Sequence, residues 1–266
     1  MPEGRYGPQP LFGAFNMRFL SVAIVAAVSF ALPAAAQERS LSFALGAGVG
    51  TAPEYFGSDS YEGNVFPILT FGSLNWGALD LGNGVRGTPD NGFSLNGAFR
   101  VLGDRTTADS PELAGLEDID AAVELGLGLR YQETNWMVFG EVRQGLTGHD
   151  GLTGTLGGDI IMREDNRWKF TVGPRLNFGD DEFANTYFGV ANTAQNFTAY
   201  TATGGALSAG IQMSGSYYLD DKWSLEGGLS YEKLLGDAAD SPITQAGSED
   251  QWRIGVGVSR IFNLNF

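Results

Sequence analysis

The feature that most constrains this chain is a period of two in its hydrophobicity, which recurs in segment after segment beyond residue 37. In WKFTVGPRLNF (Trp168–Phe178), apolar and polar residues alternate over the whole stretch. The ranges Phe93–Val101, Ala121–Tyr131, Trp136–Leu146 and Trp223–Leu235 follow the same pattern. A period of two predicts half-exposed antiparallel strands, and it leaves two architectures open: a soluble sandwich and a membrane barrel.

Charged residues on the less apolar face favour the barrel. They stand in mid-strand, where a packed interior would reject them but a water-bearing lumen would accept them. The strands also approach the roughly 9–11 residues of a tilted transmembrane strand. We predict a ladder that lines the lumen, made of Arg100, Glu124, Arg130, Glu141, Arg143, Asp159, Arg163, Lys169, Arg175, Glu226, Glu232 and Arg253. Its mixed signs indicate cross-strand ion pairs, which either close the lumen or leave a small, weakly selective pore.

Tryptophan and the chain end point to the same architecture. Trp136, Trp168 and Trp223 each follow a short polar turn, and an indole at the membrane boundary buries its ring while its N–H stays wet. We therefore predict an interfacial girdle on the periplasmic side. The last segment, WRIGVGVSRIFNLNF, is amphipathic and stops at Phe266. It is similar to the signal read by the outer-membrane barrel-assembly machinery, which makes that machinery an expected partner.

The predicted fold class is all-β: a transmembrane, antiparallel, up-and-down β-barrel. Short connections alternate with the long ones Gly103–Ile119, Gly179–Thr203 and Gly236–Asp250, as expected for periplasmic turns and outer loops. About eleven candidate strands can be read, whereas bacterial single-chain barrels use even numbers. We expect about 12 strands if Leu74–Thr88 holds two short ones, and 10 if the first segment does not pair.

The N-terminal region predicts export. The stretch MRFLSVAIVAAVSFALPAAAQ (Met17–Gln37) has one arginine, an apolar core, a proline and a small-residue cleavage site, as in a secretory signal peptide. We expect residues 17–36 to be the signal peptide, 37–266 the barrel, and 1–16 a start-site overcall or disordered leader. A transmembrane anchor is the alternative for the apolar core. The expected location is the outer membrane of a Gram-negative bacterium.

Bulk chemistry excludes several functions. The formal charge is −15 and no basic run occurs, which argues against nucleic acid as a partner. The chain has no cysteine, so disulfides and thiolate metal sites are excluded. Glycine patterns such as GAGVG lie within strands with no following helix, unlike nucleotide-binding loops. We expect no cofactor and no metal site, and we read the carboxylates of the long loops as solvated.

The candidate base for a hydrolase is the single histidine, His149, beside Asp150 in the glycine-rich turn LTGHDGLTG. No nearby serine has the context of a nucleophile. We therefore interpret His149 as a turn residue and predict no catalytic residues and no enzyme activity. A lipid hydrolase remains the second alternative.

Short motifs in two parts of the chain resemble those of a known protein family. The segment LSFALGAGVGTAPEYFGSDSYEGNVFPILTFG, with Gly46, Gly48, Gly50, Pro53, Tyr55, Gly57, Ser58 and Pro67, and the later TYFGV (Thr186–Val190) resemble the MltA-interacting protein (MipA/OmpV) family. The resemblance implies an outer-membrane protein without catalytic residues, in contact with outer-membrane lipid and lipopolysaccharide. The family's namesake is a scaffold that joins a murein hydrolase to a murein synthase. We predict a non-enzymatic scaffold for envelope proteins; the alternative is a small porin-like channel.

Overall fold

The computed structural model describes residues 39–77, 79–87, 91–165 and 167–266. They belong to one compact unit, Gln37–Phe266. The expected leader (1–16) and signal peptide (17–36) lie outside the described residues and stay predictions.

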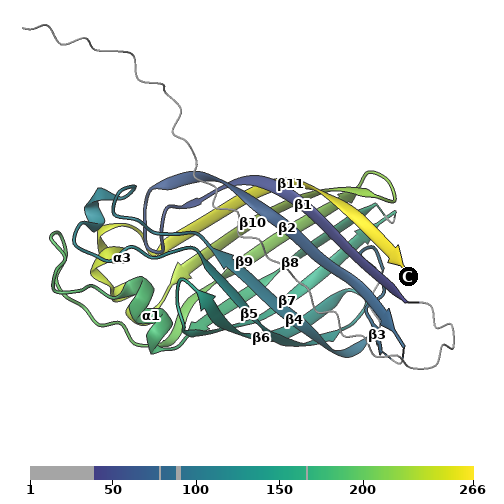
Figure 1. Ribbon diagram of the computed structural model, residues 1–266, viewed down its shortest axis with the longest axis horizontal. Helices are drawn as coiled ribbons and strands as arrows, with labels where there is room; N and C mark the ends of the chain where they lie inside the picture. Colours follow the sequence, from purple (N-terminus) through teal and green to yellow (C-terminus); the bar gives the residue numbers. More distant parts are fainter. Residues whose placement is uncertain (1–38, 78, 88–90, 166) are drawn as a thin grey trace, which may run out of the picture. The chain divides into compact units, whose positions relative to one another are not determined.

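The described strands form one antiparallel sheet of eleven strands in the order β3-β2-β1-β11-β10-β9-β8-β7-β6-β5-β4 (Figure 1). The chain therefore runs up and down, and pairing of β1 with β11 joins its two ends. The strands are β1 (Ser40–Pro53), β2 (Tyr61–Trp76), β3 (Leu79–Leu81), β4 (Gly92–Leu102), β5 (Ala122–Gln132), β6 (Trp136–Thr147), β7 (Leu152–Glu164), β8 (Trp168–Gly179), β9 (Gly205–Tyr218), β10 (Trp223–Leu234) and β11 (Asp250–Asn265).

The eleven strands of the described sheet fall between the predicted numbers of 12 and 10, and the reason lies in the first three strands. The first segment pairs on both sides, as β1 does with β2 and β11. The stretch from Leu74 yields only the end of β2 and the 3-residue strand β3. All other strands are 11–16 residues long, enough to cross a bilayer when tilted.

The sheet carries its apolar side chains outward. On the outer face Val142, Ile160 and Val256 are each 60% exposed, whereas Glu124 on the inner face is 0% exposed. A soluble sheet would bury the first three and expose the last. The inversion is that of a transmembrane barrel, whose outer surface faces lipid. The predicted fold class is confirmed.

Two sheet edges remain. In the described residues β4 pairs only with β5, and β2 beyond its contact with β3 pairs only with β1. Outward side chains beside this seam have the least cover: Val65 on β2 is 77% exposed, and Phe93 and Leu95 on β4 are each 75% exposed. We call the β2–β4 boundary the seam.

The long connections gather at one end of the sheet, which we call the cap end (Figure 1). They hold η1 (Pro111–Leu113), α1 (Asp181–Phe188), α2 (Gly236–Asp240) and α3 (Pro242–Ala246). Asp180 begins α1 by accepting a hydrogen bond from the Phe183 N–H. These connections are folded, because they share two buried apolar clusters. One centres on Phe183, Tyr187 and Phe188, and the other joins Leu113, Leu116, Val190 and Ile243. Together they form the cap.

No helix in the described part of the chain is long and apolar enough to cross a membrane.

The opposite end, which we call the turn end, carries the short connections and the C-terminus. Trp136, Trp168 and Trp223 are the first residues of β6, β8 and β10 there. Aromatic neighbours flank them, for example Tyr217, whose ring centroid lies 4.4 Å from that of Trp168. At the same end Phe266 lies beside Trp76, with ring centroids 5.8 Å apart.

The connection after β3 turns inward at the turn end. Val85 packs against Ala44, Tyr218 and Ile261, which form a small buried cluster on the inner face of the sheet. The neighbouring Arg86 stacks its guanidinium over the Tyr218 ring, 4.9 Å from the centroid. Part of the chain therefore occupies the lumen at this end too.

Candidate functional site

The inner face of the sheet holds the candidate site. All twelve residues of the predicted ladder lie in strands, at positions that alternate with those of the outer face. They fall into three groups along the lumen: one beneath the cap, one in the middle, and one near the turn end. Whether this ladder carries a function stays a proposal.

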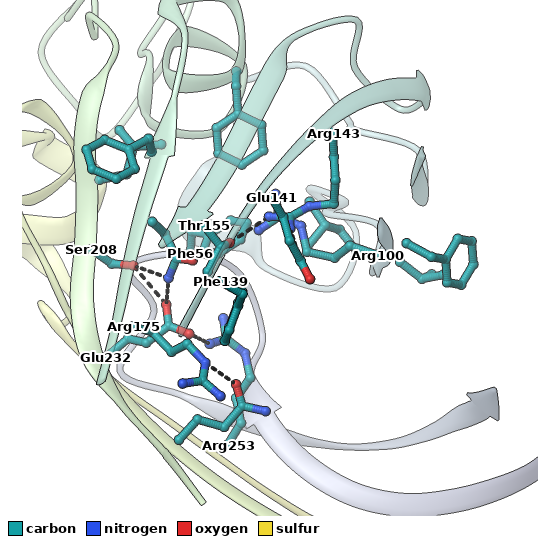
Figure 2. Close-up of a pocket in the computed structure, with 18 of the residues that line it drawn as sticks. Phe56, Arg100, Phe139, Glu141, Arg143, Thr155, Arg175, Ser208, Glu232 and Arg253 are labelled. Atoms are coloured by element: carbon teal, nitrogen blue, oxygen red, sulfur yellow. Dashed lines mark hydrogen bonds and ion pairs between the residues drawn. The ribbon is translucent and has the colours of Figure 1, made fainter. Parts of the chain in front are cut away.

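A cavity of about 570 Å³ lies beneath the cap (Figure 2). Its wall combines guanidinium groups of Arg100, Arg143, Arg175 and Arg253 with aromatic rings such as Phe139. All four of these cations form ion pairs with carboxylates of the inner face. The cavity is therefore polar, with its charges held in place by ion pairs rather than displayed freely.

The middle group consists of two ion pairs. Arg175 Nη2 donates to both carboxylate oxygens of Asp159, at 2.8 and 3.0 Å. Arg253 Nη1 lies 3.5 Å from Glu232 Oε1, while the other oxygen of Glu232 accepts from Ser208 at 2.9 Å. A single nitrogen of Arg175 on β8 thus contacts both carboxylate oxygens of Asp159 on β7, and the pair joins the two strands on the inner face.

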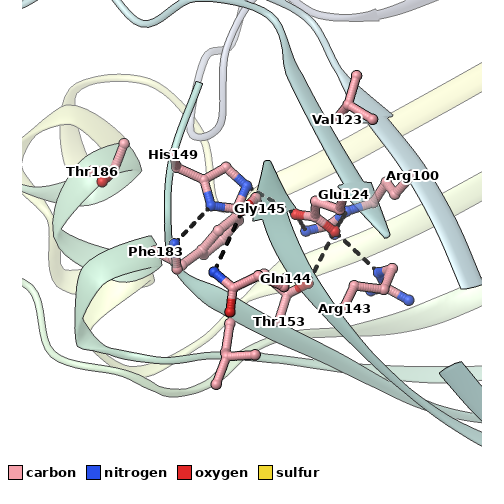
Figure 3. A network of polar contacts seen from close by, with 12 residues as sticks. Arg100, Val123, Glu124, Arg143, Gln144, Gly145, His149, Thr153, Phe183 and Thr186 are labelled. Atoms are coloured by element: carbon pink, nitrogen blue, oxygen red, sulfur yellow. Dashed lines mark hydrogen bonds and ion pairs between the residues drawn. The ribbon is translucent and has the colours of Figure 1, made fainter. Parts of the chain in front are cut away.

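Glu124 organises the group beneath the cap (Figure 3). Its carboxylate accepts from Arg100 Nε at 2.8 Å, Arg143 Nε at 3.0 Å and Thr153 Oγ1 at 3.0 Å. The fourth partner is His149 Nε2, at 3.1 Å. Arg143 also reaches Glu141 at 2.9 Å, so charge is balanced over a chain of contacts that crosses β4, β5, β6 and β7.

His149 lies in the turn between β6 and β7, and it is buried there, which the sequence did not suggest. Its Nδ1 accepts the Gly151 N–H at 3.2 Å, which leaves the ring proton on Nε2 to be donated to Glu124. Its ring lies 5.0 Å from Phe183 and 5.6 Å from Tyr187, edge to face. The physical reason is the cap, because α1 covers the turn. His149 therefore links the lumen network to the cap.

The turn-end group has a different character. Glu226 accepts hydrogen bonds from the hydroxyls of Ser216 at 2.6 Å, Ser224 at 2.7 Å and Ser259 at 3.3 Å. The three cations of the group, by contrast, form no ion pair with any residue in the described part of the chain. These are Arg130, Arg163 and Lys169.

The contacts of Glu124 and His149 decide whether this group resembles a catalytic or a metal site. Glu124 and His149 are saturated by structural partners, and no hydroxyl among the described residues lies within hydrogen-bond distance of either His149 nitrogen. The described residues also contain no group of three or more acidic or histidine side chains arranged to hold a metal ion. The arrangement ties neighbouring strands to one another and to the cap through ion pairs and hydrogen bonds.

Sequence reasoning missed the residues that cover the lumen. Tyr187 and Phe188 belong to the motif TYFGV, whose position in a long loop gave no hint of burial, yet they are 3% and 1% exposed. Val85 was also missed, because the stretch around it has no clear period.

Close approach of neighbouring atoms explains the glycines of the first segment. A Cβ at Gly46 would come within 2.1 Å of the Val258 carbonyl oxygen, and at Gly48 within 2.5 Å of the Phe66 ring. Phe66 therefore lies across a strip of glycine inside the barrel. Gly57 has φ of +91° and donates its N–H to the buried side chain of Gln251.

Residues 45–262 match the family described as MltA-interacting protein MipA. The outer membrane protein Omp26La of Vibrio anguillarum is 33% identical over 90 residues, and the matched part covers 33% of this chain and 34% of that protein. The chain thus spans about a third of that curated relative.

Among solved structures, Neisserial surface protein A is similar with a TM-score of 0.28 and 8% identity, covering 82% of this chain and 96% of that one. The outer membrane protein OprG from Pseudomonas aeruginosa gives a TM-score of 0.27 and 14% identity, with 84% and 97% covered.

The family match extends from β1 to β11 and includes every group of the inner ladder. It confirms the resemblance read from the glycine-rich first segment and from TYFGV. The chain belongs to the MltA-interacting protein MipA family and is an outer-membrane β-barrel protein.

Proposed function

We propose that this protein is a non-enzymatic scaffold, anchored in the outer membrane, for periplasmic proteins that remodel murein. The observation that carries the proposal is membership of a family whose description names an interaction with MltA. The lumen supports it, because the cap and the Val85 segment occupy its two ends with the protein's own chain.

A scaffold for murein enzymes must present its contact surface to the periplasm. Short turns and the C-terminus mark the periplasmic side of a bacterial barrel, so that surface is the turn end. The turn between β9 and β10 is well placed, since Asp221 has a 97% exposed side chain. It is also well ordered, because Asp220 accepts the N–H groups of Lys222 and Trp223 at 2.7 and 2.8 Å.

Site-specific photo-crosslinking in intact cells tests the scaffold. A photoreactive residue placed at Asp221 or Glu133, at the turn end, is expected to capture a murein hydrolase or synthase. The matched control places it at Thr107 in the cap, which faces away from the periplasm and is expected to capture neither. If no turn-end position captures a murein enzyme, the scaffold proposal is wrong.

The second candidate function is a small channel. The observation that favours it is the cavity of about 570 Å³ beneath the cap, with its charged wall. Planar-bilayer recording separates the two functions. Single-channel current from the folded protein supports the channel, and its absence removes it.

A further inference from the structure

Two like charges face each other directly on the inner face of the sheet. Arg163 on β7 and Lys169 on β8 are register partners, one step from the turn that joins the strands. Side chains of directly opposed antiparallel residues have Cβ atoms about 4.5–5.5 Å apart, and like charges there destabilise the pair. A sheet that keeps such a pair inside a lumen needs negative charge close by.

Among the described residues, no carboxylate lies at ion-pair distance from Arg163 or Lys169. Lys169 experiences the field of Arg130 as well as that of Arg163, so three cations act on the same space. Glu226 and Asp159 are two carboxylates that act electrostatically on Lys169. Each is engaged elsewhere, Glu226 by serine hydroxyls and Asp159 by Arg175.

Space for a ligand is present beside this group. A cavity of about 320 Å³ is lined by Arg86, Arg163, Lys169, Trp168 and Tyr218. Arg86 is neutralised by the exposed Asp221 at 2.6 Å, and Arg163 donates one N–H to the Thr134 carbonyl at 2.7 Å. The Lys169 ammonium makes no hydrogen bond to any described residue, so its three donors are available to a ligand.

We propose that Arg163 and Lys169 form a binding site for a phosphate group at the turn end of the lumen, with Arg130 contributing its field. A phosphate supplies several acceptor oxygens and the negative charge that the opposed pair lacks, and guanidinium and ammonium groups are its usual partners. The phosphate can come from free periplasmic solute or from a lipid headgroup, since both reach this end of a barrel.

The test uses the folded full-length protein in non-ionic detergent. Inorganic phosphate is titrated by calorimetry at constant ionic strength, and the unfolding temperature is followed with phosphate or with a non-coordinating anion. Wild type is expected to bind phosphate and to unfold at a higher temperature when it is present. Lys169→Gln and Arg163→Gln are expected to weaken binding by about tenfold or more. Lys222→Gln, which removes the same charge from a surface turn, is the matched control and is expected to bind as wild type.

The unfolding temperature of Lys169→Gln without phosphate distinguishes a ligand-binding lysine from one that stabilises the fold. Without phosphate, Lys169→Gln relieves repulsion and is expected to unfold at the same or a higher temperature than wild type. Short-chain phosphatidylglycerol, added at equal phosphate concentration, identifies the source: a response to it alone assigns the site to a lipid headgroup. The proposal is overturned if neither phosphate source binds, or if both glutamine variants bind phosphate as well as wild type.

Discussion

At the scale of single residues, Glu124 is the charge on which the cap end depends. Its carboxylate is fully buried and holds Arg100, Arg143 and His149 in one network. A buried charge that is paired and hydrogen-bonded is tolerated, but removing one partner leaves the others uncompensated.

Glu124→Gln is therefore expected to lower the free energy of unfolding by about 3–5 kcal/mol. The reason is that both arginines keep their charge while their shared carboxylate is lost. Urea unfolding in detergent, followed by the heat-modifiable band shift, measures the change. Glu133→Gln, in a turn where the carboxylate accepts a single hydrogen bond from Tyr131, is the control and should be close to neutral. Equal stability of both variants would contradict the role given to Glu124.

Asp237 makes the local stability of the cap depend on pH. The Thr203 hydroxyl and N–H donate to Asp237 at 2.6 and 2.8 Å, and these bonds hold the pKa of Asp237 below its usual range. The folded-state pKa is lower than the unfolded one, so the stabilisation is present above the ordinary aspartate pKa of about 3.9 and is lost as pH falls through the lowered value. Once the intrinsic exchange rate at each pH is divided out, the protection of backbone amides around Thr203 is expected to fall in acid, and to fall less in Thr203→Val. A Thr203→Val profile identical to wild type would count against this linkage.

At the scale of elements, the sequence predicted the strands well and the cap poorly. Alternation along Trp168–Gly179 is a local signal, so it identifies a strand and its two faces without any partner. The cap depends on contacts between distant connections, such as Phe56 with Phe183 at 6.3 Å between ring centroids. His149 shows the same limit, because its burial comes from α1, which lies beyond two strands in the chain.

The strands beside the seam are expected to be less protected from exchange than the strands paired on both sides. Alternate N–H groups along the free edges of β2 and β4 have no ladder partner in the described residues, and hydrocarbon does not tolerate such groups. In detergent, backbone amides of β4 are expected to exchange faster than those of β7, which is paired on both sides. Transfer into lipid nanodiscs is expected to protect β4 selectively. Mass-spectrometric hydrogen exchange measures both, and uniform protection of β4 and β7 in detergent would show that the edges already pair.

In the molecule as a whole, segments of the chain itself lie over both ends of the barrel. Above the lumen, Phe183 and Tyr187 of α1 lie over His149, and the apolar clusters of the cap join the three long connections. Below it, Val85 is inserted against Tyr218. The proposed scaffold function requires a rigid barrel rather than a pore, and these contacts are expected to supply rigidity at both ends.

Opening the cap should therefore change permeability without dismantling the barrel. Replacing Asp181–Thr203 with a short Gly-Ser turn removes α1, and the cavity beneath it then opens to solvent. We expect this variant to keep its heat-modifiable folded band and to conduct ions in planar bilayers, with the full-length protein silent. Replacing only the largely exposed stretch Asn192–Asn196 with Gly-Ser residues leaves α1 in place, and it is expected to stay silent. A folded α1 deletion without current would show that the cap does not block the lumen, and that the block lies elsewhere, for example at Val85 at the turn end.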